Sequence, residues 1–252
     1  MESETYRFIA SVAETKEKFP QSSWIRISTI TMNAKYSREI DYNLFKDKFR
    51  PVDNWKLSEK NGKSFYNCVV VMTSDQYTNK NVKIFPNGSI HVTGCCDLMD
   101  TVRMAKKITK LINDIMGYDG EIPTESIVTR LINTNFSCNS VINLHRTYNK
   151  FKEAGFEVDF DSDRYSAVKV KFTPVEGDRK VTVSIFSTGK ILVVTGGSIR
   201  VIADAYRIVN KKLVEYGSKV EPSEKQEQYP VFMGYPFSQW AGMVKKKGIT
   251  AW

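Results

Sequence analysis

The sequence contains few of the residues from which metal and catalytic sites are usually built. Among its 252 residues there are two histidines and four cysteines. No two cysteines have C-x-x-C spacing and none lies beside a histidine that would complete a tetrahedral set: Cys68, Cys95, Cys96 and Cys138. The sequence therefore predicts no zinc site, and cysteines this sparse favour a reducing compartment.

Long hydrophobic runs and short catalytic motifs are also missing. No stretch approaches the roughly 18 apolar residues of a membrane span, and the N-terminus lacks a basic start followed by an apolar run. There is no G-x-S-x-G element and no Gly-rich phosphate loop, and the alternating Asp159, Asp161 and Asp163 lack the later Glu of a calcium loop. We therefore expect a soluble protein that is not secreted and not an enzyme, with no cofactor, no metal and no membrane partner.

Positive charge, in contrast, is in excess. Lys and Arg number 37 against 28 Asp and Glu, which gives a formal net charge of +9. Clustered basic residues gain affinity for polyanions by releasing the counterions condensed on phosphates. The charge therefore points to a polyanionic partner such as nucleic acid, with solubility alone as the alternative explanation.

The second positive feature is an internal repeat with a period of about a hundred residues. Residues 64–73 and 82–94 correspond to residues 164–173 and 183–196. In each copy, β-branched runs are separated by turn residues, which predicts three antiparallel strands. Apolar residues then recur at helical spacing, which predicts one long helix after each copy, with Asp97 and Ser198 as caps.

Each copy is preceded by further elements. A strand near residues 24–32 or 127–136 leads to a shorter helix near 38–49 or 140–154. The sequence thus divides into an N-terminal extension at 1–20, two repeats at 21–120 and 121–217, and an aromatic and basic tail at 218–252. The tail is too aromatic for an inert linker and is expected to pack on the repeats or to dock a partner.

The duplicated motif is Ile-Phe, a turn of small residues, Gly, a β-rich strand and Thr-Gly, followed by a basic helix. This motif resembles the repeats of the TATA-box-binding protein (TBP) family over roughly residues 22–217. The resemblance implies a divergent TBP-like protein, such as a large DNA virus encodes. It implies an α+β saddle, in which two pseudo-symmetric repeats form one curved antiparallel sheet with helices on the convex face. One extra residue separates Phe186 from Thr195, compared with Phe85 and Thr93, which predicts a bulge in the second repeat.

Strand alternation divides each repeat into a face packed on helices and a free, concave face. In the second repeat Val183 and Ile185 pack, whereas Lys169, Lys171 and Phe186 face out. A face that is apolar in the middle and joined by lysines suits a DNA minor groove, because shallow apolar contacts read groove shape while lysines meet phosphates.

The family resemblance implies roles for particular residues in binding and bending A·T-rich promoter DNA. Aromatic wedges that enter base steps are expected at Phe65, Phe85, Tyr165 and Phe186. Groove or phosphate contacts are expected at Thr29, Asn67, Val69, Val71, Lys83, His91, Thr93, Asn133, Lys169, Lys171, Lys190, Val193 and Thr195. Contacts with general transcription factors of the TFIIB and TFIIA type, or with a viral RNA polymerase, are expected at Arg103, Lys106, Lys107, Arg207 and Lys211. The expected location is the nucleus or, for a viral protein, the cytoplasmic viral factory or the virion.

Plainer interpretations remain open. An aromatic residue in a strand is more often part of the core than a wedge, and a basic helix face is usually just solvated. The TBP-like fold could also serve as a scaffold or interaction protein that has lost sequence-specific DNA binding. Lysines on the concave face argue against the scaffold, because it has no use for charge there.

Overall fold

The structure is a computed structural model that describes residues 2–58, 67–76, 78–222 and 230–252. It divides into two compact units: unit 1 consists of Met1–Ser28 with Ile132–Trp252, and unit 2 is Thr29–Leu131. The fold is α+β, as the sequence predicted, with six described α-helices and ten antiparallel strands in the main sheet. Unit 2 holds most of the first repeat, and unit 1 holds most of the second repeat and both terminal segments.

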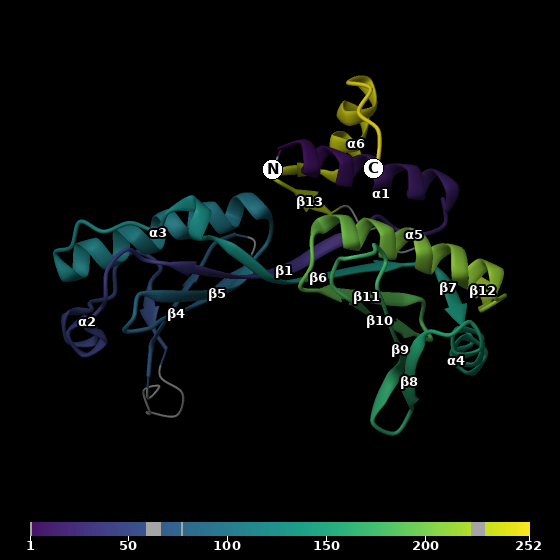
Figure 1. Ribbon diagram of the computed structural model, residues 1–252, viewed down its shortest axis with the longest axis horizontal. Helices are drawn as coiled ribbons and strands as arrows, with labels where there is room; N and C mark the ends of the chain where they lie inside the picture. The colour runs from purple at the N-terminus through teal and green to yellow at the C-terminus, as the bar shows by residue number, and fades with distance from the viewer. Residues whose placement is uncertain (1, 59–66, 77, 223–229) are drawn as a thin grey trace. The chain divides into compact units, whose positions relative to one another are not determined.

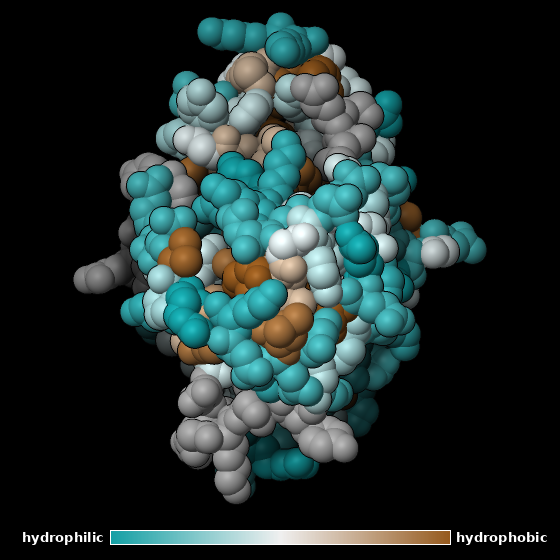
Figure 2. Space-filling view, turned by 90° about the vertical axis from the view of Figure 1, so that its left-hand side faces the viewer, coloured by the Kyte–Doolittle hydropathy of each residue, from teal (hydrophilic) through white to brown (hydrophobic). Residues whose placement is uncertain are grey.

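The strands of the first repeat lie in the order β2-β3-β4-β5-β1, and neighbours are antiparallel. Their bounds are β1 (Arg26–Lys35), β2 (Lys56–Leu57), β3 (Val69–Ser74), β4 (Asn79–Ile84) and β5 (Ser89–Cys95). Helix α3 (Leu98–Met116) lies along one face of these strands, beside the short helix α2 (Tyr42–Lys48) (Figure 1). Figure 2 looks onto this unit from the side of α2 and shows mostly hydrophilic residues there, with hydrophobic ones only in small separate patches. Both helices contribute buried apolar side chains to the core, Phe45 from α2 and a row on α3 that includes Ile108 and Ile112.

The second repeat has the matching strand order β8-β9-β10-β11-β6. Its elements are β6 (Val128–Ser137), α4 (Leu144–Glu153), β8 (Glu157–Asp161), β9 (Tyr165–Phe172), β10 (Val181–Phe186), β11 (Lys190–Thr195) and α5 (Ile199–Glu215). Helix α5 packs on β10 and β11, and α4 packs on β8 and β9. A small separate sheet pairs β7 (Ser140–Ile142) with β12 (Lys219–Pro222).

Both long helices begin where the sequence predicted. The Asp97 carboxylate accepts a hydrogen bond from the backbone N–H of Asp100 at 2.7 Å, which satisfies a donor in the first turn of α3. Ser198 is the cap residue of α5, but its hydroxyl donates to the Asp178 carboxylate at 3.0 Å and makes no bond to the helix. The helix start was therefore predictable from residue type, whereas the partner of the capping side chain was not.

The matched turns of the two repeats are built alike. Gly88 and Gly189 both have positive φ angles, of 77° and 81°. The carbonyl of each accepts a hydrogen bond from the loop after the first strand of its repeat, from Tyr36 N at 2.8 Å and from Cys138 N at 2.9 Å. A Cβ at either glycine would overlap a backbone oxygen of that loop. Glycine is thus required in both turns, because the backbone is in the left-handed region and because a side chain would not fit against the neighbouring loop.

The β-bulge expected from the different spacing of the two motifs lies in β5, in the first repeat. Strands β1 and β5 pair Thr31 with Thr93 and Ile30 with Cys95, so Gly94 is the extra residue of a β-bulge. The pairings of β11 with β10 and with β6 run without a shift as far as Thr195. The predicted bulge in the second repeat was therefore wrong, because the irregular strand is the one in the first repeat.

The cores of the two repeats differ at one pair of positions. Lys80 on β4 is only 1% exposed, and its Nζ lies 2.5 Å from the Asp75 carboxylate and 3.2 Å from that of Asp100 on α3. By strand register and by place in the helix, the matching residues of the second repeat are Val181 and Val201, both fully buried. A buried ion pair in one repeat thus corresponds to an aliphatic contact in the other.

The two terminal segments pack together in unit 1. They form α1 (Glu2–Lys18), the hairpin of β13 (Val231–Phe232) with β14 (Tyr235–Pro236), and α6 (Phe237–Lys246). Helix α1 packs against both α5 and α6. The buried ring of Phe8 lies 5.9 Å, between centroids, from the rings of Phe232 and Phe237. The aromatic tail is therefore part of a core of its own.

Candidate nucleic-acid interface

Each repeat has an open face, which we define as the sheet face opposite α3 in the first repeat and opposite α5 in the second. In the second repeat the residues that pack toward α5 are fully buried and include Val183, Ile185 and Val193. Residues between them in the strands face the other way, and cross-strand pairs place them in rows. One row is Lys171, Thr182, Val194 and Asn133, and the next is Lys169, Ser184, Leu192 and Asn135. Polar and aliphatic side chains thus alternate on this face without a covering helix.

The structure brings two predicted wedge residues of the second repeat together on the open face. The rings of Tyr165 on β9 and Phe186 on β10 lie edge to face with their centroids 5.7 Å apart. The Nζ of Lys169 lies 4.2 Å from the centroid of the Tyr165 ring. Both rings remain partly exposed. They form an aromatic pair beside a cation, outside the core.

The lysines of this face are in different electrostatic surroundings. Lys171 forms an ion pair of 3.0 Å with Glu157 on the edge strand β8, and Glu157 also lies 3.1 Å from Lys180. Both lysines lower the pKa of the Glu157 carboxyl, through hydrogen bonds and through their charge. Lys190, at the start of β11, is exposed on the open face. Part of the predicted cationic surface is therefore already balanced by carboxylate.

Four residues that the sequence predicted as DNA contacts lie on the helix-packed face of the sheet, so these predictions were wrong. Val69, Val71, Val193 and Thr195 are at most 2% exposed and pack toward the long helices. In β11 the error came from matching Thr195 with Thr93. The turns before β5 and β11 are equally long, and the strand registers show that Val194 is the equivalent of Thr93. Leu192 and Val194 therefore take the places that the sequence prediction gave to Val193 and Thr195.

In β3 the sequence prediction assigned alternate residues to the wrong faces of the sheet: it placed Val69 and Val71 on the open face. Val70 pairs with Lys83 and Met72 pairs with Asn81, so these residues share the open face. Asn67 is exposed in a bend before the strand begins, and counting alternation through that bend shifts it by one residue. Phe65 lies outside the described residues, so its role as a wedge stays a prediction.

The open face of the first repeat carries the remaining predicted residues. Lys83, Phe85, His91 and Thr93 are all partly exposed there. Phe85, Lys83 and His91 also line a surface hollow of about 430 Å³, together with Asn33 and Arg130. The two predicted groove contacts on the central strands, Thr29 in β1 and Asn133 in β6, are both half-buried.

A polar chain crosses this hollow, and the sequence prediction identified only one of its members. The Asn33 amide oxygen accepts from Arg130 Nε at 3.2 Å, and its nitrogen donates to His91 Nδ1 at 2.8 Å and to the Met32 carbonyl at 3.3 Å. Burial and, to a lesser degree, the charge of Lys83 lower the pKa of His91, so the ring is neutral near pH 7. Asn33 lies opposite His91 in the ladder, so correct pairing of β1 with β5 would have revealed it.

The predicted partner-binding residues are exposed on the outer faces of the long helices: Arg103, Lys106 and Lys107 on α3, and Arg207 and Lys211 on α5. Several are ion-paired with neighbours on the same helix. Arg207 lies 2.7 Å from Asp204, and Lys211 lies 3.5 Å from Glu215. These outer surfaces are therefore mixed in charge.

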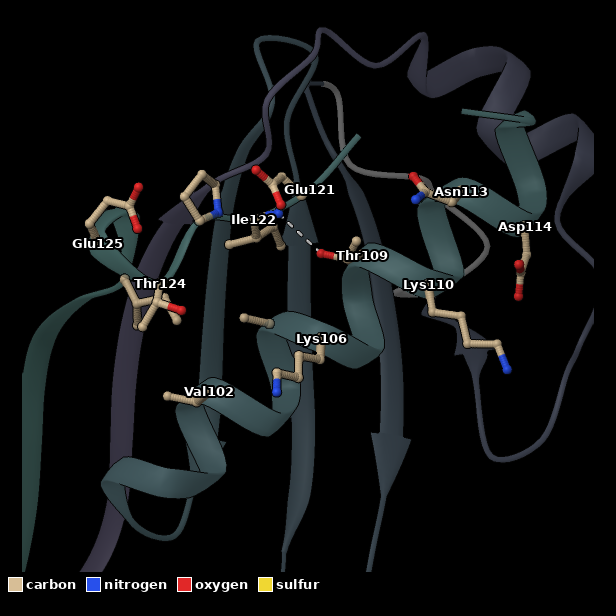
Figure 3. Close-up of a pocket in the computed structure, with 13 residues that line it drawn as sticks. Val102, Lys106, Thr109, Lys110, Asn113, Asp114, Glu121, Ile122, Thr124 and Glu125 are labelled. Carbon is tan, nitrogen blue, oxygen red and sulfur yellow. Dashed lines mark hydrogen bonds between the residues drawn. The ribbon is translucent and has the colours of Figure 1, made fainter. Parts of the chain in front are cut away.

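Beside α3 lies a second hollow, of about 650 Å³ (Figure 3). It separates the helix from the segment that follows it, which includes the 3-10 helix η1 (Thr124–Ser126). The Ile122 backbone N–H donates to Thr109 Oγ1 at 3.2 Å and ties the segment to the helix. Charged side chains line both walls: Lys106, Lys110 and Asp114 on α3, and Glu121 and Glu125 on the segment.

The residues that the structure describes form neither a metal site nor a membrane-spanning helix. Within the described ranges, no three His, Cys, Asp or Glu side chains lie together as a metal site would need. No described helix is both long and apolar enough to cross a membrane.

Comparison with known proteins finds similarity in sequence to a TBP-like protein and in fold to TBP. No protein-family model matches the chain. It is 27% identical over 256 residues to a protein of Acanthamoeba polyphaga mimivirus described as TATA-box-binding protein-like, and the match covers 81% of this chain and 69% of that protein. Its fold is similar to that of the solved Methanococcus jannaschii TBP, with a TM-score of 0.55 and 15% identity over 76% of this chain and 98% of that one. The chain is therefore a divergent TBP-like protein with the TBP fold, as its sequence predicted.

Proposed function

We propose that this protein binds and bends A·T-rich promoter DNA through the minor groove, and that it acts in transcription initiation. The observation that carries the proposal is the Tyr165–Phe186 pair, held beside Lys169 on an open face. Rings of this kind enter base steps at a cost of a few kcal/mol per step, which is recovered as the bent duplex meets more protein surface. The mimivirus relative is described as TATA-box-binding protein-like, which supports the same role.

Partner recruitment belongs to the outer surface in this proposal. The exposed residues Arg103, Lys106 and Lys107 on α3, with the charged hollow of Figure 3, offer groups of both signs to a protein partner. Arg207 and Lys211 do the same on α5. General transcription factors of the TFIIB and TFIIA type, or a viral RNA polymerase, are the proposed partners, in a nucleus or a viral factory.

The test measures affinity and bending on one A·T-rich and one G·C-rich duplex of equal length. Phe186→Ala and Phe85→Ala are each expected to weaken binding to the A·T-rich duplex about 10- to 100-fold and to reduce the bend, because an unstacking wedge is lost. Tyr235→Ala removes a more exposed aromatic residue far along the chain, in β14, and is the control for loss of a surface ring. Equal affinity for both duplexes, with binding and bending unchanged in Phe186→Ala, would overturn the proposal.

One observation favours a second candidate, a TBP-fold scaffold that has lost sequence-specific DNA binding. The acidic strand β8 lies beside β9, and Glu157 already neutralises Lys171. A scaffold would bind neither duplex measurably, or would bind both without the steep salt dependence that phosphate contacts produce. A salt titration in the same assay separates the two candidates.

A further inference from the structure

The open faces of the two repeats differ at one cross-strand row. In the first repeat the row runs Lys83 on β4, His91 on β5 and Asn33 on β1. The row at the same register in the second repeat is Ser184, Leu192 and Asn135. His91 and Leu192 are equivalent, since each is the third residue after the turn glycine of its repeat. An aliphatic side chain in one repeat therefore corresponds to an imidazole in the other.

The hydrogen bonds around His91 determine which ring nitrogen carries its proton. Arg130 Nε–H donates to the Asn33 amide oxygen, which leaves the amide nitrogen to donate to His91 Nδ1 at 2.8 Å. An imidazole nitrogen that accepts a hydrogen bond carries no proton, so the proton of the neutral ring is on Nε2. The guanidinium of Arg130 cannot reverse this order, because it has donors only.

The Nε2–H group is available to a ligand. Among the described residues, none accepts a hydrogen bond from it, and His91 lines the hollow beside the predicted wedge Phe85. In the minor groove A·T pairs present the acceptors A N3 and T O2, whereas guanine adds an N2 amino donor. A fixed donor at this point matches an acceptor of an A·T pair and opposes the guanine amino group.

We infer that His91 is a specificity-determining residue that donates a hydrogen bond from Nε2 to a minor-groove acceptor, with Asn33 and Arg130 as its positioning residues. The inference rests on the proposed function. Because Leu192 offers only an apolar contact at the equivalent place, the two halves of the DNA site are read differently. The protein therefore binds an asymmetric A·T-rich site in one preferred orientation.

The test removes or weakens single acceptor atoms of the DNA: 3-deazaadenine replaces N3 of adenine by C–H, and 2-thiothymine replaces O2 of thymine by sulfur, a weaker acceptor. An asymmetric A·T-rich duplex is scanned with 3-deazaadenine and 2-thiothymine, one position at a time, and bend and affinity are measured for each. One substitution in one half-site is expected to weaken binding about 3- to 10-fold, the effect of one lost hydrogen bond. His91→Leu should bind with no further loss from that substitution, whereas Leu192→Ala, at the equivalent position, should keep the full loss.

The positioning residues have a test that needs no DNA. The ¹⁵N chemical shifts of the His91 ring should show the Nε2–H tautomer in the unaltered protein, and a mixture of tautomers in Arg130→Ala and in Asn33→Leu. Both variants should also lose the 3-deazaadenine or 2-thiothymine effect, which loss of stability alone would not remove.

The outcomes separate this inference from the proposed function. If the unaltered protein neither binds nor bends the duplex, both fail. If it binds and bends but no substitution is coupled to His91→Leu, or if the free protein carries its proton on Nδ1, only the inference about His91 fails.

Discussion

The first repeat buries Lys80 and Asp100 where the second buries Val181 and Val201. Both arrangements link the middle strand of a repeat, β4 or β10, to the N-terminal turn of its long helix. A buried ion pair gains little net stability, because desolvation of two charges offsets their attraction. The pair does, however, penalise any packing that separates the charges. The same fold thus accepts two kinds of core contact. The valine pair tolerates small shifts of the helix on the sheet, whereas the ion pair is specific for one arrangement of helix and strand.

The outer helices differ as well. In unit 1 the terminal segments cover part of α5, since α1 packs along it and α6 packs on α1. Within unit 2, α3 packs on α2 and on its own sheet, and a charged hollow lies beside it. Within its own unit, α5 is therefore partly covered by terminal segments, whereas unit 2 contains no such segments.

Removing one member of the buried pair is expected to have the largest effect on stability. Lys80→Ala should lower the free energy of unfolding by about 3–5 kcal/mol, because it leaves the buried Asp100 carboxylate with only the exposed Arg103, 3.7 Å away, as a cationic partner. Urea unfolding at neutral pH measures the loss. The double variant Lys80→Val with Asp100→Val copies the second repeat and should recover much of it. If the double variant proved no more stable than Lys80→Ala, the two cores would not be interchangeable.

The same pair predicts a dependence on high pH. Burial alone lowers the pKa of Lys80, but the hydrogen bonds and charges of Asp75 and Asp100 outweigh burial and raise it. A raised pKa in the folded state stabilises the protein fully below the unfolded-state value of about 10.4, and this stabilisation is lost as the pH rises through the folded-state pKa. The stability difference between the unaltered protein and the double valine variant should therefore shift in favour of the variant above that pH.

The terminal segments offer the next test of the comparison. Phe8→Ala should destabilise unit 1 by about 3 kcal/mol, because it removes a fully buried ring from the cluster with Phe232 and Phe237. Hydrogen exchange should show faster exchange in α1 and on the covered part of α5, with α3 unchanged. Equal loss of protection in α3 would mean that the two units unfold together.

The paired turns are expected to respond equally, with a smaller effect. Gly88→Ala and Gly189→Ala should each cost about 1–2 kcal/mol from the left-handed backbone alone. Overlap with the neighbouring loop adds to this cost. Gly117→Ala is the control, since its φ is also positive but a Cβ there meets nothing within 4 Å. A clearly larger cost in one repeat than in the other would show that the turns are not equivalent in energy.

The sequence predicted those features that depend on period and on residue type. The two strand sets, the long helices and the Asp97 cap follow from alternation, from helical spacing and from the preference of carboxylates for helix N-termini. The misplaced residues Val193 and Thr195 show where this reasoning stops. Alternation fixes a face only after the start of the strand and its bulges are known, and a one-residue shift exchanges the two faces. The bulge at Gly94 could not be assigned to a repeat from spacing alone.

Contacts between distant segments were beyond the sequence. The bond between Arg130 and Asn33 joins residues far apart in the chain, and neither residue belongs to the repeated motif. The packing of α1 on α5 likewise depends on which of several apolar surfaces is nearest after folding. Residue type indicates that a side chain needs a partner, but only the fold decides which partner it meets.

The smallest effect is expected at the edge strand β8, where Glu157 pairs with Lys171 and Lys180. Glu157→Gln should leave the free energy of unfolding almost unchanged, because the ion pairs of Glu157 are exposed to solvent. The freed lysines should nevertheless bind DNA more tightly and steepen the salt dependence by up to about one unit of slope, as expected for one more phosphate contact. Glu215→Gln, which frees Lys211 and Lys212 on α5, should leave DNA binding unchanged. Equal effects of both variants would show that net charge, and not the open face of the second repeat, sets the affinity.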